Sequence, residues 1–456
     1  MRHVARATRP RITRRRLIAG AAGFGAGVLI LPGVNARAYA ANEKLNLALV
    51  GCGNRGGNLL ESFLRIGENV VALCDVNQQR AAKTFQKAPD VPKHLDYRKM
   101  LEENRPQIDA VLVATTDHHH APCAALAMKL GKPVYCEKPL TLTVQEARAI
   151  RQIAKQTGVA TQMGNQGTAT DAFREQVELL QTGSLGEVRD VYVWCRLSNV
   201  GIRPLPTDSE TPPPTLAWDC WLGPRAARPY NRRWVSWATW RDFGTGQLGN
   251  WGAHASAAMF RGLKLDTLWD ARPDGPSPHI RVRPRSAETN VHCFPTWEII
   301  DYEFPARDDM PPVTVHWFNG DEAPGFLEKI QQLSGSEAGG SGCLVVGTKG
   351  KYLASGHNSA YSLLSGGSKG SVTRPQPFLP RHGSHEREWL DAIRGKVKEP
   401  MSNFDFASRE IEALMLGNVA TMLGRAIEYA PLSGTCPGDE QATAALDREH
   451  REGWRL

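Results

Sequence analysis

Residues 45–63 read LNLALVGCGNRGGNLLESF, an apolar run followed by three spaced glycines and then by an amphipathic pattern. A lone Gly-x-Gly-x-x-Gly motif is weak evidence, but here it lies between a predicted strand and a predicted helix, as a dinucleotide-binding βα unit requires. Gly51 permits the tight turn and Gly53 lets the backbone approach phosphates, while Gly56 lets the helix pack closely. The first N–H groups of that helix would face a pyrophosphate.

An acidic residue stands where such a unit needs one. Asp75 ends the next apolar run, ENVVALCDV, 24 residues after Gly51. Its carboxylate would accept hydrogen bonds from a ribose diol and would repel a 2′-phosphate. This favours NAD over NADP as the cofactor, although Arg55 and Arg80 leave NADP open.

Apolar runs alternate with helical patterns through the first third of the chain, which predicts a doubly wound parallel sheet. The predicted strands are 45–51, 68–76, 110–116, 132–140 and the stretch VATQMGN. Between them lie amphipathic or alanine-rich segments, the last of which begins with a Thr-x-x-Glu capping box at Thr143. We expect an NAD(P)-binding Rossmann domain over 41–166.

Beyond residue 166 strand-like patterns dominate, which predicts a second domain over 167–456 built on an antiparallel or mixed sheet. The strand-like stretches are 186–199, 296–304, 312–320 and 342–355, separated by Pro/Gly-rich connections at 203–216, 271–287 and 365–380, and the region 386–428 returns to helical periodicity. The predicted fold class is therefore α/β, with two domains.

The first 40 residues carry the charge excess and resemble an export signal. They contain eight Arg, no Lys and no acidic residue, so the remaining 47 basic residues balance the 47 acidic ones, which excludes a basic nucleic-acid-binding surface. Arg14-Arg15-Arg16 precedes an apolar stretch at 17–31, and Ala38-Tyr39-Ala40 offers a cleavage site. Paired arginines favour the twin-arginine route over a generic secretion signal or a membrane anchor. We expect the twin-arginine translocation machinery to export the folded protein to the periplasm or beyond.

Nine cysteines without a Cys-x-x-Cys pair read as small buried apolar residues rather than a disulfide framework. A protein that folds in a reducing compartment before export would have this pattern.

A candidate catalytic lysine ends the fourth predicted strand, in Cys136-Glu137-Lys138-Pro139. Proline keeps the preceding residue extended, which places Lys138 at the rim of the sheet, where a nicotinamide would lie. A lysine there can stabilise an alkoxide or carry its proton.

The chain resembles the glucose–fructose oxidoreductase/inositol dehydrogenase/MocA (Gfo/Idh/MocA) family. The motifs that carry this resemblance are GCGNRGG, CDVNQQRA, ATTDHHHAPCAALAMKLGKPVYCEKPL and GEVRDVYVW. Four later stretches resemble the exported bacterial branch of the family: WDCWLGP, WRDFGTGQLGNWGAH, SNFDFASREIEALMLGNVA and REGWRL. The resemblance implies a Rossmann domain, a second α/β domain on a large, mainly antiparallel open sheet, NAD(P) as cofactor, sugar or cyclitol substrates and a homo-oligomer.

The resemblance also implies roles for individual residues. Lys138 and His254 match the family's catalytic lysine and histidine, with Asn250 beside them. The cofactor-binding residues expected are Gly51, Gly53, Asn54, Arg55, Gly56, Asp75, Thr115, Thr116, His120, Glu137, Lys138 and Asn165. The family commonly has Asp at the positions of Asn250 and Ala257. Without a carboxylate to raise its pKa, we expect His254 to work as a neutral base or hydrogen-bond partner.

Other polar and aromatic residues are candidates for substrate contacts. Three consecutive histidines on a strand cannot easily share one ion, so we expect no metal at Asp117-His118-His119-His120 and assign His118 and His119 to the substrate. Six of the twelve tryptophans lie between 218 and 251, where stacking on sugars and core packing are equally open interpretations. Trp251 and Arg241 are assigned to substrate binding.

Three functions remain open. The first is an NAD(P)-dependent oxidoreductase that acts on a sugar, cyclitol or glycoside hydroxyl with a tightly bound nicotinamide, NAD being preferred to NADP. The second is a redox-neutral NAD-dependent glycoside hydrolase that oxidises a hydroxyl transiently and eliminates the aglycone. The third is a cofactor-binding protein without catalysis. In each case we expect a small carbohydrate as ligand and no nucleic acid.

Overall fold

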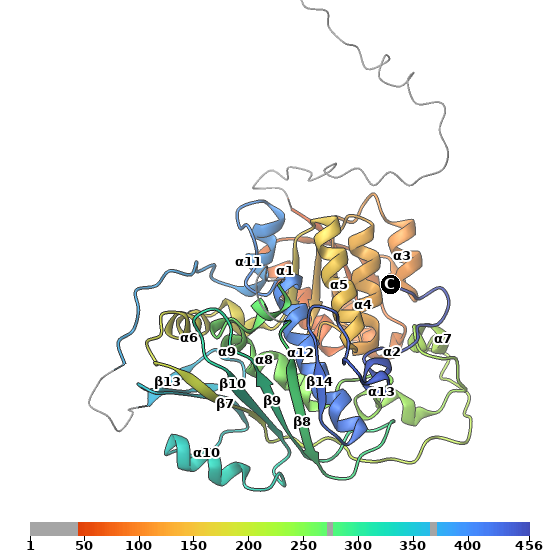
Figure 1. The fold of residues 1–456 in the computed structure, drawn as a ribbon. Helices are drawn as coiled ribbons and strands as arrows, with labels where there is room; N and C mark the ends of the chain where they lie inside the picture. The colour runs from red at the N-terminus through yellow and green to blue at the C-terminus, as the bar shows by residue number, and fades with distance from the viewer. Residues whose placement is uncertain (1–43, 271–276, 365–371) are drawn as a thin grey trace, which may run out of the picture. The chain divides into compact units, whose positions relative to one another are not determined.

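The computed structural model describes residues 44–270, 277–364 and 372–456, which belong to one compact unit (Figure 1). The predicted export signal at 1–40 and parts of two predicted connections, 271–276 and 365–371, lie outside the described residues. No helix within the described ranges is long and apolar enough to span a bilayer.

The first sheet has six parallel strands in the order β3-β2-β1-β4-β5-β6, a doubly wound arrangement. The strands are β1 (Asn46–Val50), β2 (Asn69–Cys74), β3 (Lys93–His94), β4 (Ala110–Val113), β5 (Val134–Glu137) and β6 (Thr161–Gly164). Its helices are α1 (Asn54–Ile66), α2 (Gln78–Lys87), α3 (Tyr97–Glu103), α4 (Asp117–Lys129) and α5 (Val144–Thr157). The predicted capping box at the start of α5 is present, formed by Thr143 and Glu146.

The second sheet has eight strands in the order β13-β12-β11-β7-β10-β9-β8-β14, and every pair except β7 with β10 is antiparallel. The strands are β7 (Val188–Cys195), β8 (Ile280–Ser286), β9 (Glu298–Phe304), β10 (Val313–Asn319), β11 (Ser341–Gly347), β12 (Lys351–Ser355), β13 (Tyr361–Leu364) and β14 (Ile427–Tyr429). The predicted fold class, a Rossmann sheet plus a large, mainly antiparallel sheet, is therefore confirmed.

Three details of the prediction were wrong. Strand β8 lies in a stretch that we assigned to a connection, and the single strand predicted over 342–355 is the hairpin β11–β12. Helix α4 begins at Asp117, so the three histidines lie on a helix and not on a strand.

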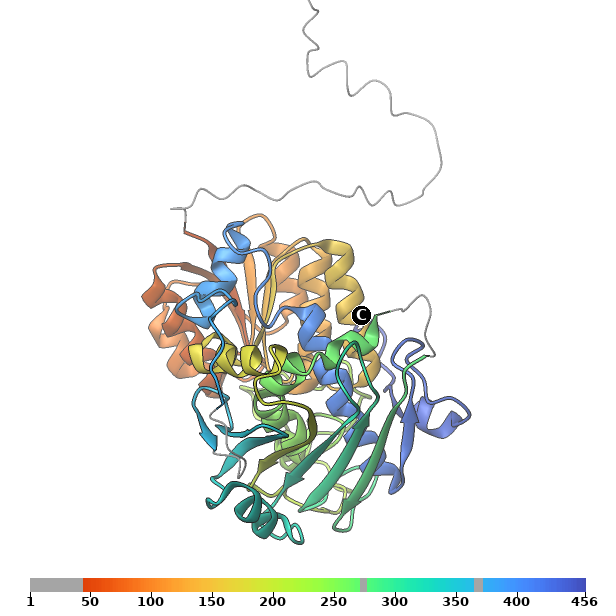
Figure 2. The same ribbon diagram turned by 60° about the vertical axis from the view of Figure 1, so that its left-hand side comes forward.

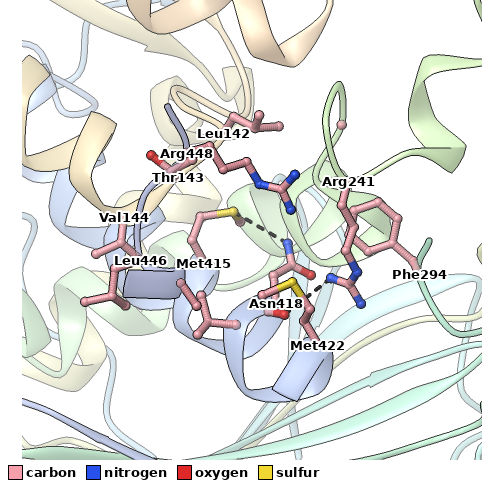
Figure 3. A pocket seen from close by; sticks show the side chains of 13 residues that line it. Leu142, Thr143, Val144, Arg241, Phe294, Met415, Asn418, Met422, Leu446 and Arg448 are labelled. Atoms are coloured by element: carbon pink, nitrogen blue, oxygen red, sulfur yellow. Dashed lines mark hydrogen bonds between the residues drawn. The ribbon is translucent and has the colours of Figure 1, made fainter. Parts of the chain in front are cut away.

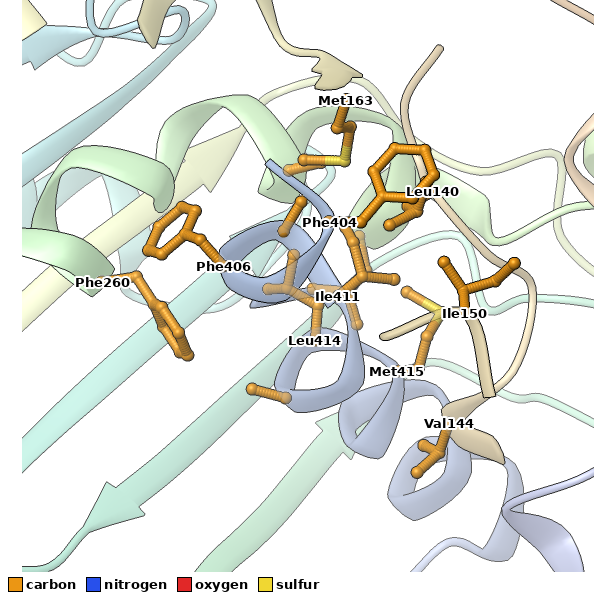
Figure 4. Packing of buried hydrophobic residues seen from close by; sticks show 14 of the residues in the cluster. Leu140, Val144, Ile150, Met163, Phe260, Phe404, Phe406, Ile411, Leu414 and Met415 are labelled. Carbon is orange, nitrogen blue, oxygen red and sulfur yellow. The ribbon is translucent and has the colours of Figure 1, made fainter. Parts of the chain in front are cut away.

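Helix α12 (Phe404–Leu423) joins the two sheets into one core. Most of its side chains are buried, and it packs against α5 on one side and β8 and β9 on the other (Figures 1 and 2). Figure 4 shows Ile411 and Leu414 of α12 among apolar side chains from both regions, including Ile150 and Phe260. The apolar burial along this helix fixes how the rim of the first sheet faces the second.

The remaining helices are α6 (Asp171–Gln181), α7 (Trp218–Leu222), α8 (Ala253–Ala255), α9 (Ala257–Gly262), α10 (Phe326–Ser334), α11 (His385–Ile393) and α13 (Glu440–Ala445). Helix α11 returns to the first sheet, where the Trp389 ring lies 5.7 Å from Phe63 and 5.8 Å from Tyr135. The C-terminal part of the chain therefore contributes to the core around β1.

Residues 197–245, which we call the strap, run from the end of β7 back to the rim of the first sheet. The amide of Gln78 donates to the carbonyl of Thr215 (3.0 Å), and the amide of Ala217 donates to that of Val76 (2.9 Å). Strap aromatics form their own buried cluster: Trp221, Trp234, Trp240 and Phe243. Three of the six clustered tryptophans therefore have a core role.

Candidate active site

A cavity of about 220 Å³ opens at the carboxyl ends of β1, β2 and β4, beside the glycine motif. Gly51 has a φ of +85°, and a Cβ there would lie 2.4 Å from the carbonyl oxygen of Ala114. A Cβ on Gly56 would lie 1.8 Å from the carbonyl oxygen of Gly51, whereas one on Gly53 would meet no atom within 4 Å. Gly51 and Gly56 therefore serve the turn, while Gly53 faces open space where a phosphate chain fits.

Asp75 lies in the wall of this cavity, as predicted, and also holds the glycine turn. Its two carboxylate oxygens accept hydrogen bonds from the amides of Cys52 and Asn77, each at 2.7 Å. Burial raises the pKa of this carboxyl, and these hydrogen bonds oppose the rise. Arg55 and Arg80 line the same cavity, so all three residues on which the NAD or NADP preference depends are in place.

The strap covers part of this cavity. Trp221, Val235 and Trp237 line it from the strap, together with the predicted residues Asn54 and Thr116. The strap therefore supplies part of the wall of this cavity.

A second cavity of about 570 Å³ adjoins the first, and Arg55, Ala114, Thr115 and Trp237 line both. Its lining includes the predicted residues His120, Glu137, Lys138, Asn250, Trp251 and His254. The structure thus brings the predicted catalytic residues together beside the dinucleotide cavity.

Lys138 is held by Asn250. The Lys138 Nζ donates to the Asn250 carbonyl oxygen (3.2 Å) and to its Oδ1, which leaves one N–H position for another partner. Burial lowers the pKa of Lys138, while the charges of Asp117 and Glu137 oppose the change. Asn250 lies on a π-helical turn (Leu248–Gly252), a distortion that is frequent at functional sites.

His254 is buried on α8, with 6% of its surface exposed. Its Nδ1 is buried without a hydrogen-bond partner among the described residues, so Nε2 is the ring nitrogen that can meet a ligand. Burial, then the charge of Lys138, hold the pKa of His254 well below its usual value, so the ring is neutral. Asn250, which the resemblance places beside both catalytic residues, holds Lys138 through its Oδ1.

Two carboxylates complete the rim of the second cavity. Asp117 accepts hydrogen bonds from the amide (3.1 Å) and hydroxyl (2.7 Å) of Thr245, which fastens the strap to α4. Glu137 accepts from Arg55, with 2.6 Å between Nη2 and Oε1, and from Gln166 Nε2 at 3.1 Å. Arg55 is therefore neutralised where the two cavities meet.

The predicted substrate contacts of His118 and His119 are corrected. Both histidines are buried, and their Nε2 atoms lie 2.9 Å and 3.0 Å from the carbonyl oxygen of Trp221. His118 lines neither cavity, and His119 lines only the dinucleotide cavity. The reason is the early start of α4, which turns these rings toward the strap.

Arg241 and Asn165 also lie away from the predicted contacts. Arg241 is buried beside a separate small cavity next to Met415 and Asn418 (Figure 3), and its guanidinium donates to the carbonyl oxygens of Cys293 (2.8 Å) and Asn418 (3.3 Å). Asn165 is 1% exposed, and its Nδ2 donates to the carbonyl oxygen of Ala253 (3.2 Å). Asn165 therefore helps to position α8.

Sequence reasoning missed several residues of the second cavity, among them Gln166, Asn199, Gln247 and His357. His357 lies on the β12–β13 hairpin, more than 100 residues beyond His254, and has no motif around it. Asp117 could have been predicted as a residue of this cavity, because it directly follows the predicted cofactor residues Thr115 and Thr116. Within the described ranges, no group of three or more His, Cys, Asp or Glu side chains is arranged to hold a metal ion.

The fold and the adjoining cavities define an α/β protein built to hold a dinucleotide beside a second ligand. Residues 45–165 match the Gfo/Idh/MocA family, described as an oxidoreductase family with an NAD-binding Rossmann fold. This match supports the resemblance inferred from the motifs. The exported, twin-arginine branch stays a prediction.

Known proteins share parts of this chain. Inositol 2-dehydrogenase 2 of Saccharopolyspora erythraea is 27% identical over 168 residues, which cover 36% of this chain and 48% of that protein. A glycosyl hydrolase family 109 protein of Stenotrophomonas maltophilia is 30% identical over 188 residues, 38% of this chain and 40% of that protein. The chain thus matches less than half the length of these relatives.

Solved structures share the fold over more of the chain. The WlbA dehydrogenase from Bordetella pertussis, in complex with NADH and UDP-GlcNAcA, superposes with a TM-score of 0.58. It is 14% identical and covers 84% of this chain and 98% of that one. At this identity the likeness establishes the fold and no more.

Proposed function

We propose that this protein is an NAD(P)-dependent oxidoreductase that acts on a hydroxyl of a sugar, cyclitol or glycoside. The observation that carries the proposal is the position of Lys138. Its ammonium has one N–H position left by Asn250, in a cavity that shares four lining residues with the dinucleotide cavity. In the neutral amine this position holds the nitrogen lone pair, so a hydroxyl bound there meets a proton acceptor beside the place for a nicotinamide.

The residues of the first cavity fit an NAD(P) cofactor. Gly53 leaves room for the pyrophosphate next to the start of α1, and Asp75 offers carboxylate oxygens to a ribose. When bound, the nicotinamide supplies a two-electron acceptor or donor. We propose NAD as the preferred form, because the Asp75 carboxylate would repel a 2′-phosphate more strongly than the exposed Arg80 would attract it.

In this proposal, Lys138 takes the proton of the substrate hydroxyl during oxidation. Its lowered pKa increases the fraction of neutral amine, the form that can accept a proton. His254, being neutral, binds a substrate hydroxyl through Nε2. Trp237 and Trp251 close the cavity with aromatic surfaces that suit the C–H faces of a sugar.

A second candidate is a redox-neutral glycoside hydrolase. The strap lies over the dinucleotide cavity, which favours an enzyme that regenerates its nucleotide in place. Relatives named as family 109 glycosyl hydrolases agree with it. We rank it second because the same observations suit a dehydrogenase that alternates between two substrates.

We also propose that the protein is exported in folded form by the twin-arginine route, carrying its nucleotide. A strap over the nucleotide supports this, because free NAD would not have to be available after export. Replacing Arg15 and Arg16 by Lys and locating the protein by cell fractionation tests the route. Retention of the variant supports it, and unchanged export refutes it.

The proposed function is tested with the purified protein, with and without added NAD. Cyclitols, aldoses and aryl glycosides are supplied one at a time, while absorbance of the reduced nicotinamide and release of aglycone are recorded together. A lasting absorbance rise supports the oxidoreductase, and aglycone over many turnovers without such a rise supports the hydrolase. Lys138→Ala should abolish either signal. If no compound gives a signal, the protein binds its cofactor without catalysis.

A further inference from the structure

A further ionisable side chain enters the second cavity from a hairpin that the first domain does not contain. His357 lies between β12 and β13 and is exposed into the cavity. Its ring centroid is 4.5 Å from that of His254 and 5.2 Å from that of Trp251. The two imidazoles therefore form one wall, with Lys138 among the residues that line the same cavity.

Hydrogen bonds fasten this hairpin to α8, the helix that carries His254. Asn358 Nδ2 donates to the carbonyl oxygen of His254 itself (2.6 Å), and Gln176 Nε2 donates to the carbonyl oxygen of Asn358 (2.8 Å). Asn358 adopts a φ of +54°, a left-handed conformation that few residues tolerate.

Two glycines show how closely the hairpin is fitted. A Cβ on Gly167 would lie 1.7 Å from the carbonyl oxygen of His357, so only glycine lets the hairpin approach the end of β6. A Cβ on Gly356 would lie 2.0 Å from Ser341 Oγ and 3.2 Å from the Trp251 ring. The packing on both sides therefore determines where the His357 ring stands.

From this geometry we propose that His357 is a substrate-contacting residue that hydrogen-bonds a second hydroxyl, next to the one held by His254. Two rings with centroids 4.5 Å apart are suited to two neighbouring hydroxyls of one polyol rather than to a single hydroxyl. The substrate class is then a vicinal polyol, and the enzyme discriminates against compounds that lack the second hydroxyl. The inference rests on the proposed function for the identity of the cavity as the substrate site.

The test uses equilibrium binding, so that it does not depend on turnover. The full-length protein, saturated with NAD, is titrated with myo-inositol, D-glucose and methyl glycosides, and then with monodeoxy analogues of whichever compound binds. His357→Ala is compared with Ser359→Ala, an exposed residue of the same hairpin that does not line the cavity. Affinity for NAD is measured for each variant, because His357 does not line the dinucleotide cavity.

We expect His357→Ala to weaken binding of the parent polyol about tenfold and to leave NAD affinity unchanged. One monodeoxy analogue should bind the wild-type protein as weakly as the parent polyol binds the variant, and should lose nothing further in the variant. Ser359→Ala should match the wild-type protein. An equal loss for the parent and all analogues, no loss, or no polyol binding at all would overturn the inference. Polyol binding that needs His357 but never reduces the nicotinamide would overturn the proposed function and leave the inference standing.

Discussion

Asn250→Asp tests the idea that the neutral partner of Lys138 sets the working pH of the enzyme. The side-chain amide of Asn250 accepts one hydrogen bond from Nζ without contributing a net charge, the backbone carbonyl of the same residue accepts another, and burial lowers the pKa of Lys138. A carboxylate in its place would stabilise the ammonium form. Oxidation needs the neutral amine, so the acid limb of the pH–rate profile follows this pKa.

The expected size of the shift follows from the contact. At a hydrogen-bond distance of about 3 Å and an effective dielectric constant of about 20, a full charge would interact with the ammonium by roughly 5 kcal/mol. That sets a ceiling of about four pKa units. Because Asn250 is exposed and Lys138 is partly exposed, solvent reduces the effect, and we expect a rise of about one to three units.

The assay is single-turnover reduction of the bound nicotinamide, followed by absorbance between pH 6 and about pH 10 with a substrate that the wild-type protein oxidises. The acid limb of Asn250→Asp should move upward by the stated one to three units, with the wild-type rate recovered at high pH. Gln247→Glu is the matched control: it adds the same charge to the cavity wall, on a residue that contacts Asn250 (3.3 Å). The acid limb of the Gln247→Glu profile should move less than that of Asn250→Asp. An unmoved limb in Asn250→Asp, or a loss of rate equal at every pH, would refute the reasoning.

Three further predictions concern the nucleotide site and the core. Gly53→Ala should keep the melting temperature but weaken NAD binding, whereas Gly56→Ala, whose Cβ would lie 1.8 Å from a carbonyl oxygen, should cost at least about 1–3 kcal/mol of stability in denaturant unfolding. Asp75→Asn should raise the ratio of NADP to NAD affinity in nucleotide titrations, and an unchanged ratio would show that Asp75 serves only the glycine turn. Burial raises the pKa of Glu410 to about 8 from 4.5, so the native state holds a proton that the unfolded chain releases, and the free energy of unfolding should fall as pH rises between these values. Glu410→Gln should remove that slope, about 1.4 kcal/mol per pH unit, and a slope equal to that of the wild-type protein would contradict the assignment.

The geometry around Glu410 agrees with a protonated carboxyl. Ser256 Oγ lies 2.7 Å from the carbonyl oxygen of Gly252 and 2.8 Å from Glu410 Oε1. A hydroxyl has one hydrogen, and the carbonyl can only accept it. The hydroxyl therefore has two acceptors for one hydrogen, and a proton on the Glu410 carboxyl would relieve this competition by donating to Ser256 Oγ.

The parts of the fold that local chemistry determines were predictable from the sequence. The glycine motif, the first-sheet strands and the capping box at Thr143 each depend on residues that are close together in the chain. Strand β8 was missed because Pro284 interrupts it, and a proline normally argues against a sheet interior. The structure shows why it is tolerated: β14 pairs only with residues 280–282, so beyond its end no neighbour needs an N–H from Pro284 on that side.

The site was predictable only where a motif marks it. Lys138 and His254 each stand in a recognisable motif, and the structure places both in one cavity. His357 reaches them through a hairpin whose position depends on Gly167 and Asn358, contacts that no local pattern encodes. Arg241 had a plausible sequence context but is used to tie the strap to α12. The roles of His357 and Arg241 depend on contacts between residues that are far apart in the sequence.

Asn250 departs from the family pattern, and the residues around it in the structure change how this departure is interpreted. In the sequence it marks the loss of a carboxylate beside His254, which predicts a neutral histidine. In the structure His254 is kept neutral by burial and by the nearby ammonium, so it does not depend on that position. The side-chain oxygen of Asn250, together with its backbone carbonyl, instead holds Lys138 without adding a charge that would raise the pKa of the lysine. Asn250 therefore leaves Lys138 easier to deprotonate than a carboxylate neighbour would, a property that a proton acceptor for a hydroxyl requires.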